Sequence, residues 1–137
     1  MNREILFKAK RLDNGEWVEG YYCKWKQIRR TICVTEEKIV DCIIVWMSDG
    51  SMLRHEIDPG TLCRYTGLTD KNGNEIWENN ILKLPDEDGY FVCEWDEDTA
   101  RFVLNGDGLT VDFDNYWSYQ VEVVGNIFDN ADLLEVE

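Results

Sequence analysis

Residues 64–78 read Arg-Tyr-Thr-Gly-Leu-Thr-Asp-Lys-Asn-Gly-Asn-Glu-Ile-Trp-Glu, and this stretch decides how the chain is expected to fold. Asn72-Gly73 lies between two runs of strand-forming residues, 62–68 and 75–77. Both turn residues accept a positive φ, so an Asn-Gly pair in this position is a strong signal for a β-hairpin. Gly67, inside the first run, is typical of a tight bend. The stretch therefore predicts a strand, a bend, a tight turn and a returning strand.

The same alternation of short strands and turns continues in both directions from this hairpin. Further turns are expected at Asp13-Asn14-Gly15, at Asp49-Gly50 and at residues 105–108, with β-branched and aromatic residues between them. Many short strands with very little helix indicate an all-β protein, mainly antiparallel, built as a sandwich or a small barrel. The other expected strands are 4–10, 17–25, 30–35, 39–47, 51–57, 81–84, 90–95, 101–104, 109–113 and 120–128, and a last short helix is expected at 131–135, capped by Asn130.

Asp58-Pro59-Gly60 is the clearest break in the sequence. It divides an expected N-terminal β-meander, residues 1–60, from a second part, residues 61–137. Because 137 residues fit one domain, we expect the two parts to pack as one compact unit.

Charge is distributed very unevenly along the chain. Residues 1–68 hold 11 basic and 10 acidic residues, a net charge of +1, whereas residues 69–137 hold 3 basic and 18 acidic residues, a net charge of −15. The sum is the net charge of −14 for the whole chain. Such a chain is expected to repel duplex DNA, because binding DNA requires basic side chains that neutralise phosphates. The first half nevertheless contains a basic cluster: Lys24, Lys26, Arg29 and Arg30.

The five cysteines form neither a metal-binding pattern nor an even disulfide framework. They are spaced by 10, 9, 21 and 30 residues, so the close pairs of zinc sites are missing. Most lie in apolar runs, where cysteine behaves as a small hydrophobic residue. Reduced core thiols, no export signal and no apolar run long enough to cross a bilayer predict a cytoplasmic protein without a membrane partner.

The sequence contains no recognisable catalytic constellation. The only histidine, His55, has no evident nucleophile near it in the sequence, and neither a phosphate-binding loop nor a nucleophile elbow occurs. A calcium loop starting at Asp70 fails, because Glu75 and Ile81 stand where glycine and glutamate are needed. We therefore expect no enzyme activity, no cofactor and no metal site.

Two acidic turns and one aromatic patch are the candidate partner-binding residues. The acidic turns could hold a divalent cation only if they converge. The aromatic patch falls in an expected loop and could line a partner pocket. These residues are Asp86, Glu87 and Asp88 in the first turn, Asp96, Glu97 and Asp98 in the second, and Tyr116, Trp117 and Tyr119 in the patch.

Three segments carry a family resemblance. Residues 64–78 hold the signature Tyr-Thr-Gly-Leu-x-Asp-x-Asn-Gly-x-Glu-Ile-aromatic-Glu, residues 5–9 read Ile-Leu-Phe-Lys-Ala, and residues 123–135 read Val-Val-Gly-Asn-Ile-Phe-Asp-Asn-Ala-Asp-Leu-Leu-Glu. In these segments the chain resembles the YopX family of phage and prophage proteins. Members usually continue the signature with Gly-Asp, where this chain has Asn79-Asn80, although asparagine also accepts a left-handed turn. We interpret the following signature residues as structural: Tyr65, Thr66, Gly67, Leu68, Asp70, Asn72, Gly73, Glu75, Ile76 and Trp77.

The resemblance implies a fold and an origin but no activity. It implies an all-β protein whose C-terminal part is a small barrel similar to SH3-type rolls, from a phage or prophage and located in the bacterial cytoplasm. The family brings no established function to this chain.

Several functional hypotheses follow from the charge pattern. The leading one is a non-enzymatic phage accessory protein that docks a basic host or phage protein on residues 69–137, and a sharper variant is a DNA mimic. The alternative is a small nucleic-acid- or ligand-binding β-barrel that uses exposed aromatic residues and the basic cluster. A head-to-tail homo-oligomer that joins the basic cluster to an acidic turn is also open.

Overall fold

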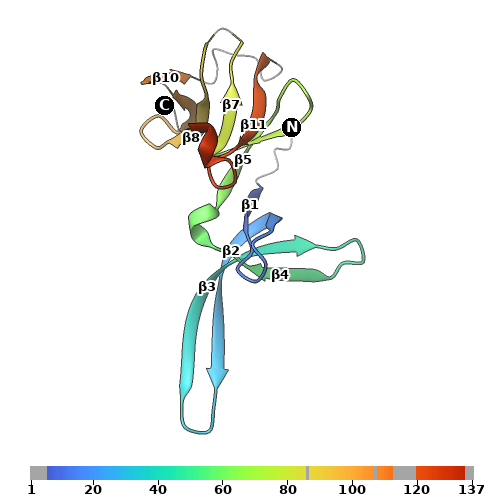
Figure 1. Cartoon of the computed structure of the whole chain (residues 1–137). Helices are drawn as coiled ribbons and strands as arrows, with labels where there is room; N and C mark the ends of the chain where they lie inside the picture. The colour runs from blue at the N-terminus through green and yellow to red at the C-terminus, as the bar shows by residue number, and fades with distance from the viewer. Residues whose placement is uncertain (1–5, 86, 107, 113–119, 135–137) are drawn as a thin grey trace. The chain divides into compact units, whose positions relative to one another are not determined.

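The computed structural model of the chain describes residues 6–85, 87–106, 108–112 and 120–134 (Figure 1). Its strands pair in antiparallel fashion, which confirms the all-β class. Among the described residues, no helix is long and apolar enough to span a membrane. The elements are β1 (Phe7–Lys10), β2 (Trp17–Arg30), β3 (Thr35–Trp46), β4 (Met52–Glu56), β5 (Cys63–Thr69), β6 (Glu75–Trp77), β7 (Asn80–Lys83), β8 (Phe91–Asp96), β9 (Arg101–Gly106), β10 (Leu109–Asp112) and β11 (Glu122–Asn126), with the 3₁₀ turns η1 (Pro59–Thr61) and η4 (Ala131–Leu134).

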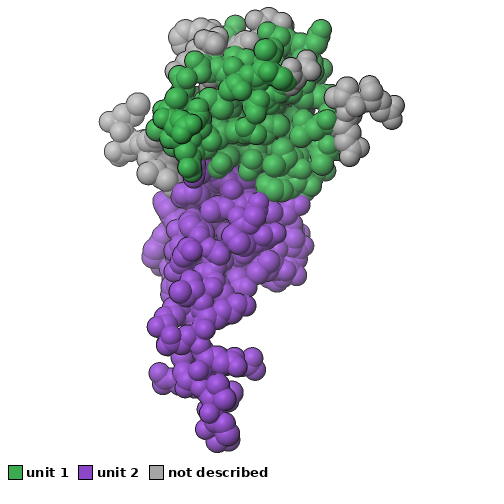
Figure 2. Space-filling model, turned by 90° about the vertical axis from the view of Figure 1, so that its left-hand side faces the viewer, with its two compact units in different colours: residues 1–3, 65–137 green, residues 4–64 purple. Residues whose placement is uncertain are grey.

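The chain divides into two compact units between Arg64 and Tyr65 (Figure 2). We call residues 6–64 the N-terminal unit and the part from Tyr65 onward the C-terminal unit. At the break seen in the sequence, Asp58-Pro59-Gly60, the chain enters η1: Asp58 is its N-cap, and the Asp58 carboxylate accepts a 3.0 Å hydrogen bond from the Gly60 N–H.

In the N-terminal unit, the strands follow the order β4-β3-β2-β1, and β1 then pairs with the first residues of β5. Alternate residues of these strands face a small core of Ala9, Ile43 and Ile57. Partly buried apolar side chains surround that core: Phe7, Val18, Tyr22, Val45 and Leu62.

The longest strands, β2 and β3, form one hairpin with a continuous register from Tyr21↔Ile44 to Arg30↔Thr35. The sequence predicted separate strands at 17–25, 30–35 and 39–47, and this is wrong for 30–35, which spans the end of the hairpin. Between residues 24 and 39 every residue of the hairpin except the half-buried Gln27 is exposed, so this part lacks the alternation of apolar and polar side chains that marks a half-buried strand.

The C-terminal unit contains the β5–β6 hairpin and a five-stranded sheet of order β10-β9-β8-β7-β11. Its core consists of Ile76, Leu82, Leu84, Phe91, Cys93, Leu104 and Val121. Asn79 has a φ of 72°, which confirms the left-handed turn expected before β7. The expected final helix is the single 3₁₀ turn η4, and the Asn130 side chain accepts a hydrogen bond from the Asn126 N–H at 3.1 Å instead of capping a helix.

The five-stranded sheet is open in the part of the chain that the structure describes. Its outermost strands, β10 and β11, do not pair with each other there, whereas a barrel requires its first and last strands to pair. The small barrel that the resemblance implied is therefore an open sheet in these residues.

Gly106 allows two strands of this sheet to approach closely. A Cβ atom at this position would lie 2.3 Å from the Tyr90 carbonyl oxygen and 3.0 Å from the Phe91 Cα. We expect Gly106→Ala to lower the free energy of unfolding by roughly 1–3 kcal/mol, as overpacking typically does, measured by urea denaturation. Gly60→Ala is the matched control, because its Cβ would meet only the Asp58 carboxylate at 3.3 Å, and equal losses in both variants would contradict this explanation.

Candidate functional site

Asp70, at the centre of the 64–78 signature, is a buried structural junction. One carboxylate oxygen accepts the N–H groups of Asn72 at 2.9 Å and Asn74 at 2.8 Å. The other accepts the N–H of Val123 in β11 at 2.9 Å. Only 4% of Asp70 is exposed. The side chain therefore joins the 70–74 turn to a strand 53 residues further along the chain.

These hydrogen bonds determine how Asp70 ionises. Burial alone would raise the pKa of its carboxyl group, but the N–H groups of Val123, Asn74 and Asn72 and the Asn74 amide together lower that pKa below its ordinary value. The charged carboxylate is thus the form that the fold stabilises.

The other signature residues also make contacts inside the fold. The rings of Tyr65 and Trp77 lie 5.0 Å apart between centroids, and the Thr66 hydroxyl donates to the Ile76 carbonyl oxygen at 2.7 Å. Gly67 has a φ of 84°, which a residue with a side chain adopts only under strain. Leu68 and Glu75, by contrast, are exposed.

The two acidic turns lie at opposite ends of strand β8. Glu87 and Asp88 precede β8, whereas Glu97 and Asp98 follow it, and all four are exposed. A six-residue strand is about 17–20 Å long, so these carboxylates do not converge on one cation. Within the described residues, no group of three or more His, Cys, Asp or Glu side chains is arranged to hold a metal ion.

Asp96 serves the geometry of the second turn. The Thr99 hydroxyl and the Asp98 N–H donate to its carboxylate at 2.9 and 3.0 Å. The Thr99 hydroxyl contributes most to lowering the pKa of Asp96.

Asp86 and the aromatic patch of Tyr116, Trp117 and Tyr119 lie outside the described residues.

The basic cluster lies on the outer part of the β2–β3 hairpin, which we call the arm (residues 24–41). In Figure 1 the arm extends as a two-stranded ribbon beyond the rest of its sheet. Lys24, Lys26, Arg29 and Arg30 are all exposed. Lys26 forms a 3.2 Å ion pair with Glu37 on β3, but more than half of each side chain is in solvent, so the pair is worth about 0–1 kcal/mol.

The arm also exposes apolar side chains, which the sequence analysis did not identify as a surface. Ile28 is 51% exposed and Ile39 is 69% exposed, and both project from the ribbon face that carries the buried Ile43 nearer the core. Ile32 and Val34 at the end of the arm are exposed as well. Ile39 and Ile43 are four residues apart, and this even spacing on one strand could have indicated that their side chains share a face.

Tyr22 and Asp41 mark the base of the arm. The Tyr22 hydroxyl donates to the Asp41 carboxylate, and this hydrogen bond, together with burial, raises the pKa of Tyr22 to about 12. The polar pair lies between the buried Ile43 and the exposed Ile39 on the same ribbon face, so the core ends there.

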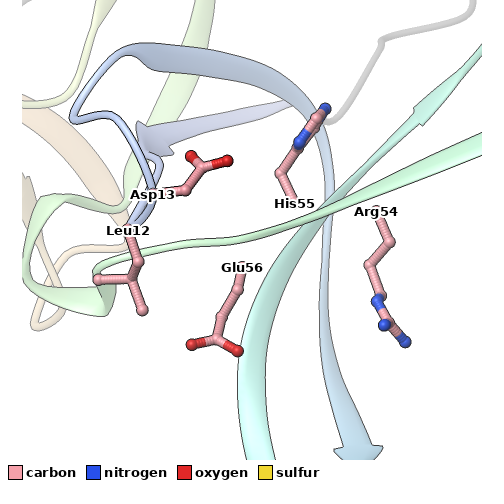
Figure 3. A pocket seen from close by; sticks show the side chains of 5 residues that line it. All are labelled: Leu12, Asp13, Arg54, His55 and Glu56. Atoms are coloured by element: carbon pink, nitrogen blue, oxygen red, sulfur yellow. The ribbon is translucent and has the colours of Figure 1, made fainter.

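A shallow depression of about 330 Å³ lies near the only histidine, lined by Leu12, Asp13, Arg54, His55 and Glu56 (Figure 3). In the close-up, Arg54 and Glu56 project to one side of the strand and His55 to the other. Arg54 lies over the Trp25 ring, 4.4 Å from its centroid, and Asp13 is paired with Arg11. These side chains do not converge as an acid, a base and a nucleophile would have to.

The Tyr22–Asp41 pair predicts a late tyrosine ionisation. We expect one of the six tyrosines of the native protein to titrate with a pKa of about 12 in a phenolate absorbance titration, and Asp41→Asn to shift that transition toward the ordinary value of about 10. Because the folded pKa is the higher one, the stabilisation is complete below about pH 10 and is lost as the pH rises toward 12. Tyr21→Phe should leave the late transition in place. If the late transition disappears in that variant, it belongs to Tyr21 and the assignment to Tyr22 is wrong.

Asp70 predicts a loss of stability in acid. Because its folded pKa is lowered, its stabilising contribution is present above the ordinary value of 3.8 and is lost as the pH falls through the lower folded value. Asp70→Asn places an amide NH₂ against backbone N–H donors, and we expect a loss of about 1–3 kcal/mol at neutral pH that shrinks in acid, measured by urea denaturation. Asp88→Asn, in an exposed turn, should cost less than about 0.5 kcal/mol. If the loss of stability in Asp70→Asn does not depend on pH, the charge of Asp70 does not stabilise the fold.

Comparison with known proteins identifies relatives only at the level of fold and family. No curated protein matches the chain. A solved structure, protein EF1440 from Enterococcus faecalis, aligns with 98% of this chain and all of its own length, at 22% identity and a TM-score of 0.52, which shows a shared fold. The family model of the YopX protein matches residues 6–135, confirming the resemblance seen in three separate segments. The chain belongs to the YopX family.

Proposed function

We propose that this chain is a non-enzymatic phage or prophage accessory protein that docks a basic host or phage protein, in the bacterial cytoplasm, on its acidic C-terminal unit. The observation that supports this is the separation of charge between the two units. Residues 65–68 carry no charge, so the C-terminal unit has the same net charge of −15 as residues 69–137.

The few cations of the C-terminal unit are already engaged within it. Lys71 forms a 3.4 Å ion pair with Glu122, and Arg101 forms a 2.8 Å ion pair with Asp112. Lys83, the third and last, lies over the Tyr90 ring. Arg101 also lies opposite Asp96 at the second turn, but the 18 acidic residues of this unit outnumber its three cations, so carboxylates dominate its charge. A surface of one sign accelerates encounter with a partner of opposite sign and selects against partners of like sign.

Docking a protein is better supported than the other hypotheses. A DNA mimic needs two phosphate-like rows of carboxylates, whereas the described turn carboxylates lie at opposite ends of one strand. A nucleic-acid-binding barrel would need the basic cluster on the barrel, but the cluster lies on the arm of the N-terminal unit.

Salt-gradient affinity capture tests this function. The immobilised chain is exposed to nuclease-treated bacterial lysate, with and without phage induction, and bound proteins are identified by mass spectrometry. We expect basic proteins that are released as salt approaches about 1 M, where the Debye length falls to about 3 Å.

The matched variant replaces four exposed carboxylates by neutral side chains of the same shape: Glu87→Gln, Asp88→Asn, Glu97→Gln and Asp98→Asn. It should lose most of the captured proteins, because it removes charge without changing the core. A partner that stays bound at about 1 M salt, or that binds the neutral variant equally well, would argue against electrostatic docking.

A further inference from the structure

The arm continues the core-facing side of its sheet into solvent. On one ribbon face, Ile43 is fully buried, while Ile39, four residues further along β3, is 69% exposed. Ile28 on β2 adds a second exposed apolar side chain to that face. The other residues of this face within the arm are polar: Lys24, Lys26 and Arg30 on β2, and Thr35, Glu37 and Asp41 on β3. The two exposed isoleucines therefore lie among charged side chains on a mixed surface.

Both edges of the arm are open in the described residues. β1 pairs with β2 only over Trp17–Gly20, and β4 pairs with β3 only over Cys42–Trp46. The Ile57 N–H donates to the Asp41 carbonyl at 3.0 Å, so the open edge of β3 ends there. The outward backbone N–H and C=O groups of residues 24–30 and 35–40 are thus a template for an additional strand.

Few contacts hold the arm by itself. An isolated two-stranded hairpin is marginally stable in water, and the Ile32-Cys33 tip lacks the glycine or asparagine that tight hairpin turns favour. The tip is closed by the Thr31 N–H, which donates to the Val34 carbonyl at 2.8 Å, and by the Val34 N–H, which donates to the Thr31 hydroxyl at 3.1 Å. A partner that packs on the faces or pairs with the edges of the arm would therefore stabilise its ordered conformation.

The charge of the arm selects the chemistry of that partner. Residues 24–30 on β2 carry four basic side chains and no acid, and the whole arm carries five basic and three acidic residues. The partner should be acidic. The exposed isoleucines and the carboxylates of Glu36, Glu37 and Asp41 favour a protein over a nucleic acid, whose phosphates those carboxylates would repel.

This chain itself offers such a partner surface, the acidic turns of its C-terminal unit. We propose that the arm of one copy docks on the acidic turns of the C-terminal unit of a second copy, so that the basic protein of the proposed function is another molecule of the same chain. The contact joins two different surfaces, so it is heterologous and builds a ring or a filament. This inference rests on the acidic unit being a docking surface.

A pair of complementary variants tests the contact. The arm variant carries Lys24→Gln, Lys26→Gln, Arg29→Gln and Arg30→Gln, and the acid variant is the neutral one described above. Each lacks one half of the contact and retains the other. We expect the wild-type chain to form species larger than the 16.1 kDa monomer at low salt in sedimentation velocity, and each variant alone to stay monomeric. An equimolar mixture of the two variants should form a dimer of twice the monomer mass.

The control variant keeps the charge of the arm, with Lys24→Arg, Lys26→Arg, Arg29→Lys and Arg30→Lys, and should assemble like the wild type. The late Tyr22 titration reports whether the base of the arm remains folded in each variant. A wild-type chain that stays at 16.1 kDa at low salt, or a variant mixture that stays monomeric, overturns the proposal.

The outcomes also separate this inference from the proposed function. A monomeric chain whose acidic turns still capture basic proteins from lysate keeps the function and rejects self-assembly. If the chain neither captures basic proteins nor assembles with itself, both the proposed function and this inference are rejected. Binding of a single-stranded oligonucleotide that the wild type shows and the arm variant loses would assign the arm to nucleic acid and overturn the inference as well.

Discussion

The carboxylate of Asp70 is held between the 70–74 turn and β11 by three backbone N–H groups. Burying a charge is costly unless hydrogen bonds replace its water, so this arrangement fixes both segments at once. β11 in turn pairs with β7, and β7 brings Leu82 into the core with Phe91 of β8. The family signature and the C-terminal segment that shares the resemblance, far apart in the sequence, thus meet at one side chain.

Local features of this fold could be predicted because they depend on single residues. Gly73 and Asn79 have a positive φ in their turns, as glycine and asparagine readily do, and neighbouring residues are enough to recognise both turns. The Asp70–Val123 hydrogen bond joins residues 53 apart, and no local pattern encodes it. The arm could not be predicted for another reason: hydrophobic periodicity reports burial on one face, and in the arm only Val40, at its base, is buried. Of the candidate site, the sequence identified the charges but not which of them share a surface.

The separation of charge has a structural counterpart in the two units. In the C-terminal unit, each of the three cations is engaged by a neighbour, so the carboxylates at the ends of β8 set the sign of its surface. In the N-terminal unit, the cations gather on one strand of an exposed ribbon. The basic arm of one molecule and the acidic C-terminal unit of another therefore carry opposite charges and attract each other.

The basic residues of β2 also restrict how arms can meet. Open strand edges tend to pair with copies of themselves, and lysine on an edge is a common protection against this. Antiparallel pairing of residues 24–30 with the same residues of another copy would place Lys24 opposite Arg30 twice and bring eight cations together on one short ribbon, which like-charge repulsion opposes. Because these charges oppose pairing between two arms, the exposed isoleucines of the arm are not covered by another arm. They can contact an acidic surface instead. The same residues thus exclude the symmetric contact and favour the heterologous one.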